Sequence, residues 1–167
     1  MLTIEQFKQD PKAALWSQLD AETAVLLGID GITTFMKPMS AKPDLDADIV
    51  WFFTDRRSET FGILNGTKSA NICIANGQDN FWAEIKGTIT VAENAEAIAN
   101  KWSATIESWY EKGKDDPNLL LLAFKPDSAE ISVSTSNPLK FSWQTVKAIL
   151  GDQSKPNISE QRRVSFA

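Results

Sequence analysis

The stretch Asp48–Thr60, DIVWFFTDRRSET, constrains the fold of this chain more than any other segment. Its apolar run predicts a strand over Asp48–Thr54 that is buried on both faces, because a half-exposed strand would alternate apolar and polar residues. The run ends in a hydroxyl, two arginines and a serine that opens a helix-like segment. A strand end, paired cations and a helix N-terminus together are suited to holding a phosphate group. The alternative is a solvated turn in which Arg56 and Arg57 bind nothing.

The composition removes several classes of chemistry. The chain contains no histidine, which excludes Ser-His-Asp and Cys-His nucleophile systems and the commonest ligand of zinc and haem. Cys73 is the only cysteine, so no intrachain disulfide can form, and its place in the alternating run NICIA predicts a buried, inert thiol. The net charge of −5 argues against nucleic acid as the main partner, because binding to a phosphate backbone needs a basic face.

The length of 167 residues fits a single domain over residues 1–151, followed by a polar tail over 152–167 that we expect to be loose. The N-terminus lacks the charged-then-apolar pattern of a signal peptide, and no apolar run approaches ~20 residues. Neither Arg56–Arg57 nor Arg162–Arg163 makes a polybasic membrane-binding cluster. We therefore expect a cytoplasmic protein that binds no membrane.

Periodicity and turn residues predict mostly antiparallel strands joined by hairpins. Asp30-Gly31 and Asn76-Gly77 lie between β-capable runs and are strong hairpin signals, and Pro126-Asp127 marks a further turn. The polar loop Ser40–Asp48 lacks the glycine and glutamate of an EF-hand calcium loop, so we expect a solvated turn and no metal site. Strands are predicted over residues 23–29, 32–39, 48–54, 69–75, 80–91, 119–124 and 129–134.

Three or four helices are predicted outside these strands. The first has a capping box at Thr3 and is kinked or split at Pro11, and the second is short and is capped by Ser58. The clearest helix begins after Asn94, and its apolar stripe is more typical of a core than of a ligand site. That stripe consists of Ile98, Trp102, Ile106 and Trp109. The helices are expected over residues 3–18, 58–64, 94–110 and 142–150.

The order of these elements predicts the fold class. Six or seven mostly antiparallel strands with peripheral helices are typical of an α+β barrel rather than of βαβ repeats. The chain contains neither a Rossmann GxGxxG motif nor a Walker GxxxxGK[ST] motif, so the common dinucleotide and nucleoside-triphosphate folds have no support.

Five short motifs in order carry a family resemblance. From Ala21 to about Leu150 the chain resembles the general stress protein 26 branch of the pyridoxamine 5'-phosphate oxidase-like split barrels, which bind FMN. The resemblance implies a split β-barrel and a homodimer with an FMN at each of two sites in the subunit interface; FAD or another flavin is less expected. The motifs are the hairpin around Gly31, Lys37-Pro38-Met39, WFFT with Ser58 four residues on, Lys86-Gly87, and WYEKGKDDPNLLLL over 109–122.

The resemblance also implies roles for individual residues. Lys37 would contact the flavin or its phosphate, Met39 would pack beside the isoalloxazine ring, and Ser58 would meet the phosphate, where Arg57 adds charge. The family pattern has a lysine where this chain has Thr60, and the branch commonly has a tryptophan where this chain has Ser132. Phe53 and Thr54 would offer main-chain contacts and a hydroxyl, Trp82 lies on the strand that lines the ring, and Trp109 and Lys114 would come from the other subunit. The expected cofactor-binding residues are Lys37, Pro38, Met39, Phe53, Thr54, Arg57, Ser58, Thr60, Trp82, Trp109 and Lys114.

Three functions stay open at this stage. The first is an FMN-dependent oxidoreductase or flavin reductase of unknown substrate in a general stress response. The second is a flavin carrier or sensor without turnover, and the third is a split barrel that has lost its flavin and acts as an interaction dimer. No residue is identifiable as a dedicated catalytic acid or base. A true pyridoxamine 5'-phosphate oxidase is not expected, because the C-terminal QRRVSFA lacks the histidine of that enzyme's substrate motif.

Overall fold

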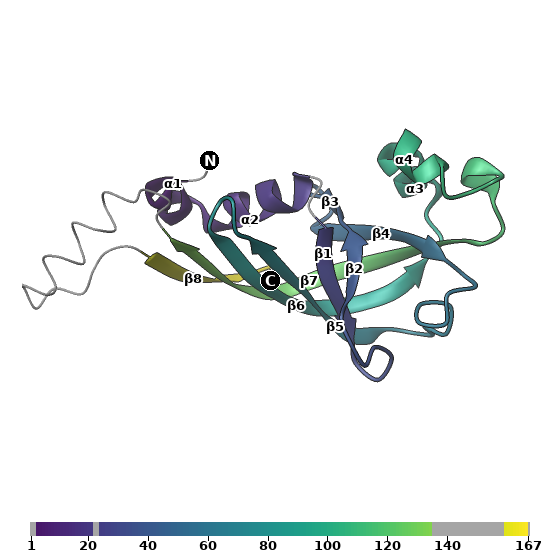
Figure 1. The fold of residues 1–167 in the computed structure, drawn as a ribbon, viewed down its shortest axis with the longest axis horizontal. Helices are drawn as coiled ribbons and strands as arrows, with labels where there is room; N and C mark the ends of the chain where they lie inside the picture. Colours follow the sequence, from purple (N-terminus) through teal and green to yellow (C-terminus); the bar gives the residue numbers. More distant parts are fainter. Residues whose placement is uncertain (1–2, 22–23, 135–158, 167) are drawn as a thin grey trace, which may run out of the picture.

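The computed structural model describes residues 3–21, 24–134 and 159–166 (Figure 1). These residues form one curled sheet of eight strands, and two short helices, α1 (Ile4–Gln9) and α2 (Pro11–Asp20), pack on its inner face. The strands are β1 (Ala24–Ile29), β2 (Lys37–Ser40), β3 (Lys42–Asp44), β4 (Ile49–Asp55), β5 (Lys68–Asn76), β6 (Phe81–Ala92), β7 (Leu119–Ser134) and β8 (Ser159–Ser165). The other helical segments are α3 (Ala95–Lys101), α4 (Ala104–Glu107) and the 3₁₀ turn η1 (Gly113–Asp115).

The sheet order confirms the predicted antiparallel α+β split barrel. The strands follow the order β2-β1-β5-β6-β7-β4-β3, β8 pairs with the second half of β7, and every pairing is antiparallel. The described residues contain eight strands, against the six or seven predicted. Because the sheet curls, β2 comes into contact with β4 from the other end of the order. We call this line of contact the seam.

Alternating side chains fill the inside of the curled sheet. Ile72 and Ile74 of β5 and Phe81 and Ile85 of β6 are buried, whereas the residues between them face the outer side. The helices cover this inner face because their own apolar side chains need burial, and Phe7 is completely buried there. The main core therefore lies between the sheet and α1–α2.

The N-terminal helices follow the prediction closely. The chain is split at Pro11, Thr3 and Gln6 form the predicted capping box, and Asp10 caps α2 by accepting from the backbone N–H of Ala13 at 2.8 Å. The residue after β8, Phe166, packs edge-on against Trp16 of α2 with ring centroids 5.9 Å apart. The end of the chain therefore helps to hold these helices on the barrel.

The C-terminal segment was predicted to be loose after Gly151, and this is wrong for Ser159–Ser165. These residues form β8, which pairs with Ser128–Ser134 of β7. Arg163 donates to the Glu130 carboxylate at 2.8 Å, so polar cross-strand pairs stabilise a strand that has little apolar character. The helix predicted over residues 142–150 lies outside the described residues.

Two strand predictions need correction. The strands predicted on either side of Pro126 are one continuous strand, β7, whose register against β6 shifts at Lys86/Gly87. A bulge accommodates the proline because that position donates no ladder hydrogen bond. The hairpin after β1 is also looser than predicted: β2 begins only at Lys37, because Thr33 turns the chain back by accepting from the backbone N–H of Ile29 at 2.8 Å.

Two helix predictions are also wrong. The segment after Ser58 forms successive turns and no helix. The helix predicted over 94–110 breaks where Trp102 adopts an extended backbone, and Ser103 caps a new helix, α4, by accepting from the N–H of Ile106 at 3.3 Å. Two separate capping residues, Asn94 and Ser103, therefore begin two short helices where hydrophobic spacing alone indicates one.

The break in this helix positions both pieces against the outer side of β4 and β7. Ala97 of α3 packs with Trp51 and Leu121, and Ile106 of α4 packs with Tyr110 and Leu119. Phe53 borders both of these small clusters. As a result, α4 and the residues after it stand next to the seam.

Cys73 is only half-buried, so the predicted burial of its thiol is wrong in degree. It lies on the outer side of β5, opposite Glu84. Partial burial, and then the Glu84 carboxylate, raise the pKa of the Cys73 thiol. No helix within the described residues is long and apolar enough to cross a membrane. Residues 3–21, 24–134 and 159–166 also contain no cluster of three or more acidic, cysteine or histidine side chains suited to a metal ion.

Candidate functional site

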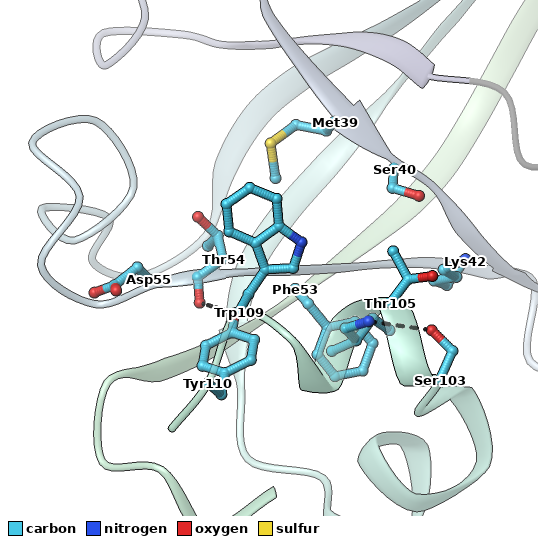
Figure 2. Close-up of a pocket in the computed structure, with 11 residues that line it drawn as sticks. Met39, Ser40, Lys42, Phe53, Thr54, Asp55, Ser103, Thr105, Trp109 and Tyr110 are labelled. Carbon is cyan, nitrogen blue, oxygen red and sulfur yellow. Dashed lines mark hydrogen bonds between the residues drawn. The ribbon is translucent and has the colours of Figure 1, made fainter. Parts of the chain in front are cut away.

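A cavity of about 320 Å³ opens at the seam, between β2–β3, the end of β4 and the α4 region (Figure 2). We call it the seam pocket. Its volume lies at the lower end of the range of about 300–1,000 Å³ that is typical of small-molecule sites. The pocket exists because the two ends of the sheet meet here without pairing along their length. It is lined by Met39, Ser40, Lys42, Phe53, Thr54, Asp55, Ser103, Thr105, Ile106, Trp109 and Tyr110.

The side chains around its centre are apolar or aromatic. Figure 2 shows the indole of Trp109 standing between Met39 on one side and Tyr110 on the other. Trp109 is 80% exposed, so its large ring faces the opening rather than the core. Phe53 is held in place from behind by the ring of Trp102, edge-on at 5.9 Å between centroids. A planar aromatic ligand could contact Trp109 and Met39 without displacing core residues.

Tyr110 joins the α4 region to β4. Its hydroxyl donates to the main-chain carbonyl of Thr54 at 2.7 Å. Burial, and then the negative charges of Asp55 and Asp116, raise the pKa of Tyr110 to about 12. The hydroxyl therefore stays protonated at neutral pH and acts as a fixed donor that sets the width of the pocket.

Asp55 and Arg57 form an ion pair at one end of the pocket. The guanidinium donates from Nε to Oδ1 at 3.0 Å and from its terminal nitrogen to Oδ2 at 2.7 Å. The backbone N–H of Arg57 donates to the same carboxylate at 2.7 Å. These hydrogen bonds, led by the one from the guanidinium, lower the pKa of Asp55 to about 2. Both groups are therefore charged at neutral pH.

Most backbone N–H groups of the turn after β4 already form hydrogen bonds within the protein. The Ser58 Oγ accepts from the N–H groups of Thr60 at 3.3 Å and Phe61 at 3.2 Å, and its carbonyl accepts from Gly62 at 2.8 Å. The backbone N–H of Arg56 donates to the carbonyl of Asn118 at 2.7 Å. No helix N-terminus is present here to bind an anion, and the Ser58 hydroxyl keeps only its own O–H to donate outward.

The structure brings together four of the eleven predicted binding residues. Met39, Phe53, Thr54 and Trp109 line the seam pocket, and Arg57 adjoins it through Asp55. Trp109 lines the pocket of its own chain, whereas the resemblance implied a contact from the other subunit. Lys37 and Pro38 are exposed at the start of β2, Ser58 and Thr60 lie in the turn after β4, and Lys114 lies 6.0 Å from the ring of Trp102. Trp82 lies on the outer face of β6, 41% exposed, and is not part of this pocket.

Several residues of the pocket were not predicted. Lys42 and Asp55 lie close in sequence to Lys37-Pro38-Met39 and to WFFT, and this proximity to the family motifs was an available signal. The residues in and around α4 carried no sequence signal for a pocket. The predicted continuous helix placed its apolar stripe in the core and its hydroxyls in solvent. The unpredicted residues are Ser40, Lys42, Asp55, Ser103, Thr105, Ile106 and Tyr110.

Residues 10–157 match the family model described as pyridoxamine 5'-phosphate oxidase like. The chain belongs to this family, whose split barrel it shares, and the predicted kinship to the general stress protein 26 branch is confirmed. General stress protein 26 of Bacillus subtilis (strain 168) is 28% identical over 100 residues, which are 57% of this chain and 71% of that protein.

Solved structures agree with this assignment. A crystal structure from Jannaschia sp. CCS1, named for general stress protein 26, is 30% identical with a TM-score of 0.78 over 95% of this chain and 99% of that one. The general stress FMN/FAD binding protein of Xanthomonas citri is 27% identical with a TM-score of 0.71, over 77% of this chain and 92% of that one. The fold of the described residues is therefore that of a known group of proteins, at least one of which is named for flavin binding.

The residues of the seam pocket fit a flavin ring better than they fit its phosphate. The ring would meet Trp109, Met39 and the hydroxyl of Thr54, a combination of apolar surface and few polar groups that is common in cofactor sites. The phosphate would meet Ser58 and Arg57, and the guanidinium of Arg57 already binds a carboxylate. Binding of the phosphate by Arg57 therefore requires that Arg57 exchange its partner, the Asp55 carboxylate, for the phosphate.

Proposed function

We propose that this chain is a cytoplasmic FMN-binding protein of the general stress protein 26 branch and a flavin-dependent oxidoreductase whose substrate is unknown. The single observation that carries the proposal is that Met39, Phe53 and Thr54, expected at the flavin from two separate motifs, line one pocket. The name of the Xanthomonas citri relative, a general stress FMN/FAD binding protein, also supports a flavin.

The residues around the pocket would hold the flavin without taking part in proton transfer. When bound, the flavin supplies the redox chemistry, and the protein supplies orientation and electrostatics. Asp55 stays ionised and Tyr110 stays protonated across the neutral range, because their pKa values are about 2 and about 12. Lys37, at the start of β2, would stabilise negative charge on the ring from the exposed side.

A homodimer forms part of the proposal. The outer face of the sheet carries two large exposed apolar side chains, Leu26 on β1 and Trp82 on β6. A second copy packed on this face would bury both of them. The family resemblance implies that such a dimer brings Trp109 and Lys114 of each subunit toward the flavin of the other. Sedimentation of the purified full-length chain at micromolar concentration tests this point: a monomer at all concentrations would exclude it.

A flavin titration tests the proposed binding. Purified chain should quench the fluorescence of FMN with a stoichiometry of one flavin per chain. Trp109→Ala should weaken the affinity by about tenfold, since stacking on an aromatic side chain contributes about 1–3 kcal/mol per ring. Phe35→Ala is the matched control, because Phe35 is 77% exposed and lies outside the pocket. If FMN fails to bind, or binds equally well to Trp109→Ala, the proposed site is wrong.

Turnover separates an oxidoreductase from a carrier. The loaded protein should be reduced by NADH or NADPH and reoxidised in repeated cycles, whereas a carrier would bind flavin without catalytic reduction. The second candidate, an interaction dimer that has lost its flavin, is favoured by one observation: Thr60 stands where the family has a cation, and the turn pairs its own donors. Absence of flavin binding together with a stable dimer would support that alternative.

A further inference from the structure

One ion pair lies between the seam pocket and the turn expected to bind phosphate. Asp55 lines the pocket, and its carboxylate binds the side chain and the backbone N–H of Arg57. Figure 2 shows Asp55 beside Thr54, at the end of the pocket away from Ser103. A ligand that fills the pocket and extends past Thr54 therefore meets this carboxylate before it meets the guanidinium.

Apart from the side chain of Arg56, the rest of the turn offers an anion few unpaired donors. The backbone donors of Arg56, Thr60 and Phe61 are already paired within the protein, as is that of Arg57. Glu59 and Thr60, which follow Ser58 in this turn, add no positive charge to it. Arg56 is exposed, and among the described residues its side chain forms no ion pair. Lys42 on β3 is the cation of the pocket lining itself, whereas Arg57 is the cation of this turn that contacts a pocket residue. That contact is with the carboxylate of Asp55, which holds the guanidinium.

We propose that Asp55 is a specificity-determining residue: its carboxylate competes with the phosphate of a bound flavin for Arg57 and so sets how strongly the site prefers FMN over riboflavin. The inference rests on the proposed flavin binding. A phosphate dianion is a stronger partner for a guanidinium than a carboxylate, and the pair is exposed, so exchange is feasible. Once Arg57 has moved, the unpaired carboxylate of Asp55 repels the dianion, which keeps the preference for FMN small.

The closing experiment compares two ligands that differ only in the phosphate. Dissociation constants of FMN and riboflavin are measured by flavin fluorescence for the full chain and for Asp55→Asn, Arg57→Gln and the double variant. The expected result is that Asp55→Asn increases the ratio of the riboflavin constant to the FMN constant at least about threefold, because Arg57 is released and a repelling charge is removed. When Arg57 is already replaced, Asp55→Asn should matter less: the ratio should increase clearly less from Arg57→Gln to the double variant than from the unchanged protein to Asp55→Asn.

Asp115→Asn is the matched control, since it makes the same change in net charge at an exposed residue that forms no hydrogen bond or ion pair with Arg57 among the described residues. It should leave the ratio unchanged. An unchanged or lower ratio in Asp55→Asn overturns the proposal. The proposal is also overturned if the ratio increases equally whether or not Arg57 is present. The effect of Asp55→Asn would then be one of charge alone and would not involve Arg57.

A second measurement keeps this inference separate from the flavin proposal. If neither flavin binds to any variant, the proposed function fails, and inorganic phosphate is titrated instead while the side-chain Nε–H resonance of Arg57 is followed by NMR. Phosphate should perturb this resonance at a concentration at least about threefold lower in Asp55→Asn than in the unchanged protein. Equal phosphate dependence in the two proteins overturns the competition whether or not a flavin is the ligand.

Discussion

Replacement of Tyr110 by phenylalanine tests how much one hydrogen bond stabilises the α4 region against β4. Tyr110 is buried, and its hydroxyl donates to the carbonyl of Thr54 at 2.7 Å. Loss of this bond should lower the free energy of unfolding by about 1 kcal/mol at neutral pH, within the usual range of about 0.5–1.5 kcal/mol for a hydrogen bond. For a chain of this length, that corresponds to a decrease of about 2–4 °C in Tm.

The same substitution should change how stability depends on pH. The pKa of Tyr110 in the folded protein is about 12, above its ordinary value of 10.0, so the folded state holds the proton more tightly than the unfolded state does. The resulting stabilisation is complete below pH ~10 and is lost as the pH rises toward 12. We expect a loss of about 1–2 kcal/mol across this interval. This is less than the full value of about 1.4 kcal/mol per pKa unit, because Tyr110 also lines the open seam pocket, where solvent screens its surroundings.

Urea unfolding at several pH values between 7 and 11 provides the assay. Tyr110 is the only tyrosine in the chain, so phenolate absorption also reports its ionisation directly. In Tyr110→Phe, stability should fall less steeply above pH 10 than in the unchanged protein. The reasoning is refuted if the two proteins have parallel stability curves, or if phenolate absorption appears with a midpoint near 10 while the protein is still folded.

Two further predictions concern the barrel itself. Gly87→Ala should destabilise the protein by about 2 kcal/mol or more, since a Cβ at this bulge would lie 2.1 Å from a backbone carbonyl of β7; Gly77→Ala, where a Cβ meets open space, should change stability little. Phe166→Ala should cost about 1–2 kcal/mol through the lost contact with Trp16, and an equal loss in Phe35→Ala, which removes an exposed ring, would contradict this. Chemical denaturation measures all four variants.

The predictable parts of the fold are those governed by local spacing. The strand after Asp48, the hairpin around Asn76-Gly77 and the split at Pro11 follow from apolar runs, turn residues and the geometry of proline. What spacing could not predict depends on competing caps and on partners distant in sequence. Ser103 begins a new helix within an apolar stripe. The residues of β8 carry no strand pattern of their own, and they form a strand because they pair with β7, distant in sequence.

The candidate site was predictable at residues that belong to the family motifs and unpredictable at the charged and helical residues around them, for a related reason. A motif identifies a residue at the end of a strand, such as Thr54, because the strand fixes where that residue points. It does not reveal whether a neighbouring charge is available. The sequence suggests that Arg57 is a free cation. In the structure, the turn that follows β4 brings its guanidinium into an ion pair with Asp55, two residues earlier.

The split in the barrel explains why a ligand site would arise at this position. Strands paired along their length leave no room for a ligand between them, because neighbouring backbones lie only ~4.8 Å apart. At the seam, β2 and β4 touch without pairing, and the wedge between them is closed by Trp109 and Tyr110 of the α4 region instead of by backbone hydrogen bonds. The floor of the pocket is therefore a fixed part of the sheet, while its lid is a short helical segment held by the bond from Tyr110 to Thr54. Ligand selectivity can then change through the lid and the turn at Asp55 without any change to the core of the barrel.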